Sequence, residues 1–275
     1  MSVHRFDALR PSPSIHANPH APSPVLDAES ARNGIAAGHL NLAFQPIVCL
    51  SHGLSHRSQV LARWRPPGDR TRPLDELVAG ADVDGTAALL GGAVLDRATL
   101  AMAHTGPSTR VAIRLPGAQF RDPSLPSDVF RVLTRHGLAP GSLSIQVPAM
   151  AALADIRTAS VTLQTLRDLG CSVGLADVGS MIGSLSQMHR LPLDFVQFGR
   201  ATVTRLLVEP DVLSLVGTLL MTAEERGLPS VADGVETVEQ LDWLRDLGCR
   251  FAQGPVLGPV GRTMDLPAPH ECPQP

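Results

Sequence analysis

The 275-residue chain contains no lysine and no tyrosine, so all 23 of its basic residues are arginines. Because arginine stays protonated near neutral pH, chemistry that relies on a lysine side chain exchanging a proton is excluded. The four cysteines are scattered without a C-x-x-C pair, which argues against a zinc ribbon or a redox motif; they are Cys49, Cys171, Cys249 and Cys272. We expect them to be reduced and mostly buried.

The sequence also lacks a strong excess of charge. Its formal net charge is −3 and its pI is about 6.3, so no basic field would attract nucleic acid or an anionic membrane surface. The first thirty residues hold no apolar run long enough for a signal peptide or a membrane span. We therefore expect neither a nucleic-acid nor a membrane partner, and a cytoplasmic location.

The N-terminal segment 1–30 is rich in proline, serine, alanine and histidine, which predicts a disordered leader. We interpret its irregularly spaced histidines as solvated rather than metal-binding. The length of the remaining chain fits one large domain. We predict a barrel domain over 31–265 and a short tail over 266–275.

From residue 41 onward, short apolar runs alternate with amphipathic helical stretches. The candidate strands are 42–50, 58–64, 111–116, 143–148, 172–179, 193–199, 229–235 and 250–256. The helix ending LRDLGC occurs twice, at 166–171 and 244–249, and Gly137 and Gly227 end two further helices before strands. Thr237 and Gln240 have the spacing of a capping box. Eight strand–loop–helix units predict an α/β fold of the (β/α)₈ TIM-like barrel type.

In such a barrel, chemistry takes place where the strands end and the loops begin. The polar residues at these positions are Arg114, Gln146, Asp177, Gln197, Asp233 and Gln253. Half of them are amides, which hydrogen-bond a ligand well but bind divalent cations poorly. His52 and His56 have a spacing compatible with zinc, but we place both in a strand-connecting loop and favour a solvated turn. His189 with Ser184 or Ser186 lacks the G-x-S-x-G frame of a nucleophile.

Six segments, in this order and spacing, resemble the EAL domain of bacterial cyclic-di-GMP phosphodiesterases. They are FQPIV (44–48), SQVLARW (58–64), ADVGSMIGSL (176–185), RLPLDFVQFGR (190–200), VADGVET (231–237) and GCRFAQGP (248–255). The resemblance covers about residues 32–262. It implies an EAL-type barrel that hydrolyses one phosphodiester bond of cyclic di-GMP with a water activated by two Mg²⁺ or Mn²⁺ ions.

Several positions depart from the pattern that this resemblance implies. Gln59 stands at the glutamate of the E-A-L signature, Arg114 at a ligand asparagine and Gln146 at a ligand glutamate. Of the paired family aspartates, the first is Ala176 and the second is kept as Asp177. These changes remove negative charge and add a positive one, so we expect no resident metal ion.

The remaining departures concern proton transfer and the last ligand positions. Gln197 and Gly199 occupy the lysine and aspartate of the family's K-I-D motif, and Asp233 replaces a glutamate. A glutamine amide cannot accept and return a proton near neutral pH. The resemblance therefore leads to the hypothesis that hydrolysis is impaired.

The groups that the family uses to bind the dinucleotide are partly kept, namely Gln45, Leu61, Arg63, Asp177, Glu236 and Gln253. We expect a catalytically impaired EAL-like domain that serves as a signalling or regulatory module, through cyclic di-GMP or a protein partner, with a homodimer as a further option. The alternatives are a phosphodiesterase with residual activity and a scaffold that has lost its ligand.

Overall fold

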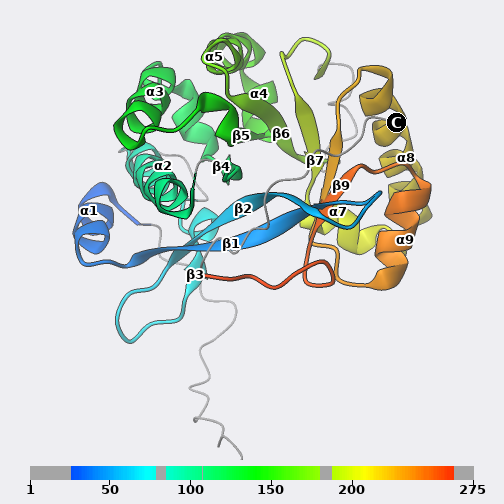
Figure 1. Ribbon diagram of the computed structural model, residues 1–275, viewed down its shortest axis with the longest axis horizontal. Coiled ribbons are helices and arrows are strands. Elements are labelled where there is room, and N and C mark those ends of the chain that lie inside the picture. Colours follow the sequence, from blue (N-terminus) through cyan, green and yellow to red (C-terminus); the bar gives the residue numbers. More distant parts are fainter. Residues whose placement is uncertain (1–25, 79–84, 107, 180–187, 263–275) are drawn as a thin grey trace, which may run out of the picture.

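The computed structural model describes residues 26–78, 85–106, 108–179 and 188–262. In these residues a single sheet has the strand order β1-β9-β8-β7-β6-β5-β4-β2-β3, and an additional β1–β2 pairing closes it into a barrel (Figure 1). The strands are β1 Leu40–Cys49, β2 Ser55–Trp64, β3 Arg72–Pro73, β4 Val111–Arg114, β5 Leu143–Pro148, β6 Ser172–Val178, β7 Phe195–Phe198, β8 Ser230–Asp233 and β9 Phe251–Gln253. The predicted TIM-like barrel is confirmed.

Helices cover the outside of this barrel (Figure 1). They are α1 Ala28–Ala36, α2 Thr86–Thr105, α3 Leu125–His136, α4 Ala149–Ala154, α5 Ile156–Asp168, α7 Arg200–Arg205, α8 Pro210–Glu225 and α9 Val238–Asp246. Gly137 and Gly227 both adopt a left-handed backbone, with φ of 65° at each, where they follow α3 and α8 as predicted. The predicted capping box is also present, because Thr237 accepts from the Gln240 backbone N–H and the Gln240 side chain accepts from that of Thr237.

The start of the barrel differs from the expected strand–loop–helix repeat. Strands β1 and β2 form an antiparallel hairpin, and β1 also pairs antiparallel with β9. The turn between β1 and β2 is too short for a helix, so it can only reverse the chain. The prediction that His56 lies in this loop is therefore wrong: His56 belongs to β2, and only His52 lies in the turn.

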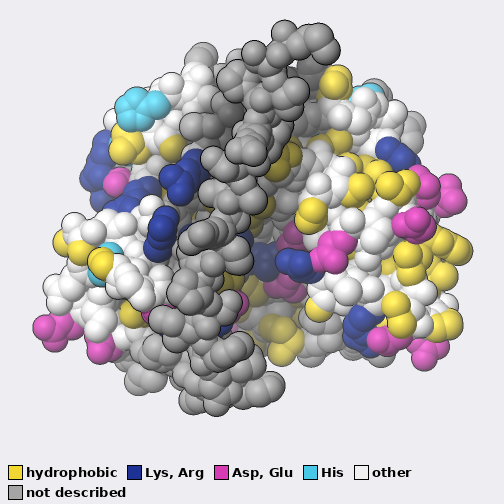
Figure 2. Space-filling view, turned by 90° about the horizontal axis from the view of Figure 1, so that it is seen from below, with side chains coloured by type: hydrophobic (Ala, Val, Ile, Leu, Met, Phe, Trp, Pro, Cys, Tyr) yellow, Lys and Arg dark blue, Asp and Glu magenta, His cyan; other side chains and the backbone are white. Residues whose placement is uncertain are grey.

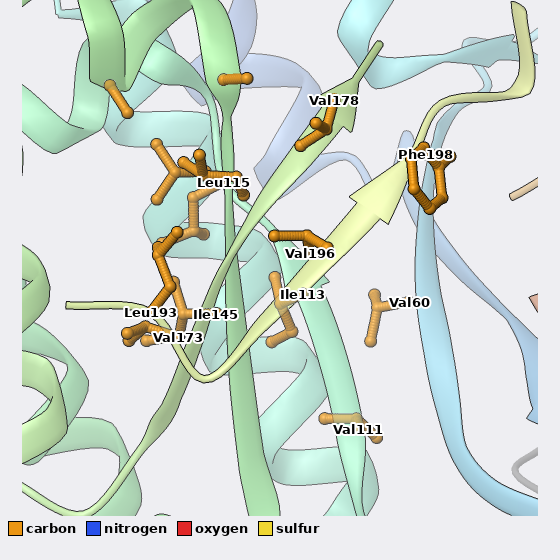
Figure 3. Close-up of a cluster of buried hydrophobic side chains, with 14 of the residues drawn as sticks. Val60, Val111, Ile113, Leu115, Ile145, Val173, Val178, Leu193, Val196 and Phe198 are labelled. Carbon is orange, nitrogen blue, oxygen red and sulfur yellow. The ribbon is translucent and has the colours of Figure 1, made fainter. Parts of the chain in front are cut away.

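The outward faces of the strands carry the main hydrophobic core. Figure 3 shows such side chains from neighbouring strands, including Val60, Ile113, Ile145, Val196 and Phe198, all buried. A second, smaller cluster lies inside the barrel and consists of Ile47, Cys49, Ala112, Phe195, Val231 and Phe251. Ala112 on β4 and Val231 on β8 are not on adjacent strands, so this cluster spans the lumen. We call it the lower tier.

The chain ends and cysteines complete the comparison with the sequence. Residues 1–25 and 263–275 lie outside the described residues, and the predicted domain boundary at residue 31 falls within α1. Cys171 and Cys249 are free and buried, and burial raises the pKa of each thiol to about 11. Cys49 is disulfide-bonded, so the expectation of a reduced thiol is wrong there.

One helix among the described residues is long and apolar enough to cross a membrane by length and composition. It is α2, and half of its most apolar 18-residue window is buried inside the structure. A helix that covers the core of a barrel shows the same composition, because its inner face must be apolar.

Candidate functional site

A ring of polar side chains lies two residues further along the strands than the lower tier. Because side chains alternate between the two faces of a strand, residues two apart share the lumen face, about 7 Å further along the strand. Ala112, Phe195, Val231 and Phe251 are thus followed by Arg114, Gln197, Asp233 and Gln253. With Gln59, Gln146 and Asp177, these residues form what we call the upper tier. The predicted mouth residues are therefore brought together.

Arg114, the last residue of β4, is the centre of the upper tier. Its Nη1 donates to Asp177 Oδ2 at 3.0 Å, and its Nη2 donates to Gln197 Oε1 at 3.4 Å. Its Nη2 also lies 3.7 Å from Asp233 Oδ2. One guanidinium therefore connects β4 with three strands across the lumen and faces both carboxylates. In the view from below, basic and acidic side chains lie side by side in the hollowed central part of that face (Figure 2).

Asp177 has an unusual backbone conformation. Its φ of 59° is the only positive value at a non-glycine position among the described residues. Such a conformation is uncommon for a side-chain-bearing residue and is found disproportionately at functional sites. The β6–β7 register also shifts between Leu175 and Val178. A Cβ atom at Gly199 would lie 2.6 Å from Asp177 Oδ1, so this aspartate can take its position because residue 199 is glycine.

Asp233, at the end of β8, is the more buried of the two carboxylates that face Arg114. Gln253 Nε2 donates to its Oδ1 at 2.6 Å. Burial raises the pKa of Asp233 above the ordinary value, and the Gln253 hydrogen bond and the Arg114 charge oppose this rise only in part. Asp233 therefore takes up a proton at a higher pH than a solvated aspartate does.

Four glutamines complete the upper tier, and all are buried: Gln59, Gln146, Gln197 and Gln253. Both polar side-chain atoms of Gln146 lack a hydrogen-bond partner among the described residues, as do Gln59 Oε1, Gln197 Nε2 and Gln253 Oε1. Buried polar atoms of this kind cost about 1–3 kcal/mol each when they stay unpaired. The upper tier is thus rich in hydrogen-bonding groups that the described part of the protein itself does not use.

A small cavity of about 110 Å³ opens beside this ring. Gln59, Leu61, Arg63, Arg114, Asp233 and Gln253 contribute to its lining. Leu61 and Arg63 follow Gln59 on β2 at the same alternate positions, so they extend the lumen face toward solvent. The cavity therefore combines three of the predicted dinucleotide contacts, Leu61, Arg63 and Gln253, with Arg114.

The other predicted site residues lie nearby but have different partners. Gln45 on β1 is buried opposite Gln59, and its Nε2 donates to the Gly258 carbonyl at 3.4 Å. Glu236, after β8, pairs with Arg200 at the start of α7, an arginine that the sequence analysis did not single out. Ala176 is fully buried and has no polar side-chain atom to offer.

The two weaker constellations do not assemble a site in the described residues. Ser184 and Ser186, the proposed partners of His189, lie outside them. His56 stacks on Phe251 with ring centroids 4.8 Å apart, at the opposite end of the lumen from the upper tier. Within the described ranges, no group of three or more His, Cys, Asp or Glu side chains is placed to hold a metal ion.

These features define a closed (β/α)₈-type barrel with a polar, arginine-centred mouth. A comparison with protein families matches residues 28–259 to the EAL domain. The chain is 30% identical over 230 residues to the cyclic di-GMP phosphodiesterase NbdA of Pseudomonas aeruginosa, covering 82% of this chain and 29% of that protein. It is also 30% identical over 231 residues to an uncharacterized signaling protein of Caulobacter vibrioides, covering 84% and 29% of the two chains.

Solved structures of EAL proteins are also similar to this chain. The PaMucR phosphodiesterase in complex with c-di-GMP superposes with a TM-score of 0.79 at 28% identity, over 85% of this chain and 96% of that one. The FimX EAL domain of Pseudomonas aeruginosa bound to c-di-GMP has a TM-score of 0.78 at 23% identity, over 88% and 99%. The chain belongs to the EAL domain family. It spans less than a third of the length of the curated relatives named above.

Proposed function

We propose that this EAL domain does not hydrolyse cyclic di-GMP at a useful rate and instead acts as a signalling or regulatory module in cyclic-di-GMP pathways. The observation that carries this proposal is the position of Arg114, whose guanidinium pairs with both Asp177 and Asp233. These are the two carboxylates of the upper tier.

The residues of the upper tier do not fit a pair of divalent cations. Mg²⁺ and Mn²⁺ prefer anionic oxygen ligands, whereas this ring offers mostly neutral amides. A dication about 4 Å from Arg114 would be repelled by up to about 8 kcal/mol at an effective dielectric constant of about 20. To bind there, a cation would also have to displace Arg114 from Asp177 and Asp233.

The residue at the family's lysine position supports the same proposal. Gln197 is fully buried, and its Oε1 accepts a hydrogen bond from Arg114. An amide in this place holds the guanidinium but carries no proton that can be exchanged near neutral pH. The chain contains no lysine to take over that role.

Dinucleotide binding without cleavage is the activity that we favour for the module. Two solved relatives are described as complexes with c-di-GMP. In this chain, Arg63 and Arg114 line the mouth cavity and offer planar guanidinium groups, which suit phosphate oxygens. Arg114 would then supply the positive charge near the phosphate that metal ions supply in an active enzyme. A protein partner or a second copy would read out the bound state.

The alternative is a phosphodiesterase with residual activity, favoured by the 30% identity to NbdA. Purified protein given Mg²⁺ or Mn²⁺ and cyclic di-GMP decides between the two, because we expect the dinucleotide to stay intact over hours. Turnover approaching about one per second, within the ordinary range of enzymes, would refute the proposal.

Thermal unfolding with and without cyclic di-GMP separates a sensor from a scaffold that has lost its ligand. A ligand at about a hundred times its dissociation constant adds about 2.7 kcal/mol to the free energy of unfolding. The Arg114→Ala variant in metal-free buffer should lose affinity in calorimetry. Unchanged affinity would reject the role of Arg114 in holding phosphate.

A further inference from the structure

A second cavity, of about 330 Å³, lies at the opposite end of the barrel lumen from the mouth. The buried side chains of Ile47, Ala112, Phe195, Val231 and Phe251 form its floor, and all of them belong to the lower tier. Its half-buried rim comes from the N-terminal ends of the parallel strands and includes His56, Arg57, Ser172, Asp194, Pro229 and Arg250. Its volume is at the lower end of the range of small-molecule sites.

Arg57 gives this cavity a positive charge that no carboxylate of the described residues neutralises. Its Nη2 lies 3.0 Å from His56 Nε2, its one side-chain hydrogen-bond contact among the described residues. Asp194, the only carboxylate among the described lining residues, pairs with Arg167 at 3.0 Å and accepts from the Val173 backbone N–H at 2.9 Å. The carboxylate of Asp194 thus already has partners other than Arg57.

The surroundings of Arg57 raise the energy of its charged form. Burial, and secondly the charge of Arg110, lower the pKa of Arg57 to about 10. An anion beside the guanidinium would reverse both effects, since it would replace lost hydration and offset the repulsion from Arg110. A negatively charged group bound in the cavity would therefore stabilise the charged form of Arg57.

Aromatic faces lie next to this positive charge. The His56 ring is stacked on Phe251 with an interplanar angle of 29°, and the Arg250 guanidinium carbon lies 5.6 Å from the centroid of the same Phe251 ring. Phe195 lines the same cavity. Flat apolar faces beside a cation favour a planar ring that carries an anionic group.

We infer that this basal cavity is a second ligand site, distinct from the mouth, for a small aromatic anion such as a nucleoside monophosphate. Arg57 holds the anionic group, and Phe195 and the stacked His56–Phe251 pair border the planar part. Arg57 and Arg63 are six residues apart on β2, so the two arginines are separated by about 20 Å along the strand, whereas the nearest lining residues of the two cavities, such as Arg57 and Gln59, are two residues apart. Binding here would not depend on the residues of the upper tier.

The test measures the shift in unfolding temperature of the full chain with four probes: GMP, guanosine, benzoate and inorganic phosphate. We expect GMP to stabilise the protein, guanosine and phosphate alone to do so much less, and benzoate to show whether a ring with a carboxylate suffices. In Arg57→Met, which keeps a long side chain, calorimetry should show GMP affinity falling about tenfold or more, the value of a charge-assisted hydrogen bond.

Two controls assign the site. Arg205→Met removes an arginine paired with Glu209 on the exposed surface and should leave GMP binding unchanged. Arg114→Ala alters the mouth, so it should remove only GMP bound there and keep the binding that Arg57→Met removes. If no probe stabilises the wild-type protein more than Arg57→Met, or if Arg114→Ala removes GMP binding as strongly as Arg57→Met, the inference is wrong. Neither outcome depends on whether cyclic di-GMP is cleaved.

Discussion

Neighbouring residues on the barrel strands face two different environments. Ile113, Ile145 and Val196 point outward into a close-packed apolar layer, whereas the next residue on each strand, Arg114, Gln146 and Gln197, lines the lumen. All six side chains are buried or half-buried. The outward side chains are apolar and lie in an apolar environment, whereas the lumen side chains are polar and only partly hydrogen-bonded by the described residues. The core and the candidate site thus occupy alternate positions of the same strands.

The lumen itself shows a second contrast along its axis. The lower tier is apolar and carries its polar groups on the rim, whereas the upper tier is made of amides, Arg114 and two aspartates. The lower tier borders the basal cavity with apolar side chains. The upper tier leaves polar atoms without partners among the described residues, which is characteristic of a surface kept for a ligand rather than for stability.

The largest change in stability should come from a substitution on the outward face of the strands. Phe198→Ala removes a fully buried ring and should lower the free energy of unfolding by about 3–5 kcal/mol, measured by urea denaturation. Phe130→Ala is the matched control, because this phenylalanine is 55% exposed and should cost less than about 1 kcal/mol. Similar costs for the two variants would contradict the assignment of the outward face as the main core.

A substitution in the lumen should instead raise the free energy of unfolding. Gln146→Leu replaces two unpartnered polar atoms with an apolar group of similar size, so we expect a gain of about 1–3 kcal/mol in the free energy of unfolding. Gln164→Leu on the exposed face of α5, where the amide donates to Asp168, should lack this gain. A loss of stability in Gln146→Leu would mean that the buried amide has partners that the described residues do not provide.

Replacing the arginine at the mouth should have a moderate effect on stability. Arg114→Met leaves Asp177 and Asp233 facing each other without a cation, and we expect a loss of about 1 kcal/mol at neutral pH, since the pairs are partly solvated. The loss should shrink in acid as Asp233 protonates. Mn²⁺ should stabilise this variant more than the wild-type protein in thermal melts, and equal stabilisation would contradict the view that Arg114 keeps cations out.

The smallest effect concerns the pH dependence contributed by Asp233. Its folded pKa is raised above the ordinary 3.8, so the folded state keeps this proton over a pH window in which the unfolded state loses it. The stability of the wild-type protein relative to Asp233→Asn should therefore fall as pH rises from 3.8 through the raised value. Urea denaturation of both proteins across acidic pH measures this difference, and a rise instead of a fall would show that Arg114 outweighs burial.

Much of this molecule follows from the sequence alone. The alternation of apolar runs and amphipathic helices, the glycines after α3 and α8, and the capping box at Thr237 are local signals, so they predicted the barrel correctly. The positions of Arg114, Gln197 and Asp233 at strand ends also follow from local pattern, because strand parity decides which face a side chain takes. The absence of lysine is a property of composition and needs no structure.

Tertiary structure decided what these residues contact. The pairing of β1 with β9, the left-handed backbone of Asp177 beside Gly199, and the pairing of Arg114 with two aspartates all depend on residues far apart in the chain. The same holds for the basal cavity, where Arg57 and Phe251 meet only because the barrel closes. Side-chain partners across a lumen depend on strand register and closure, which local sequence does not encode.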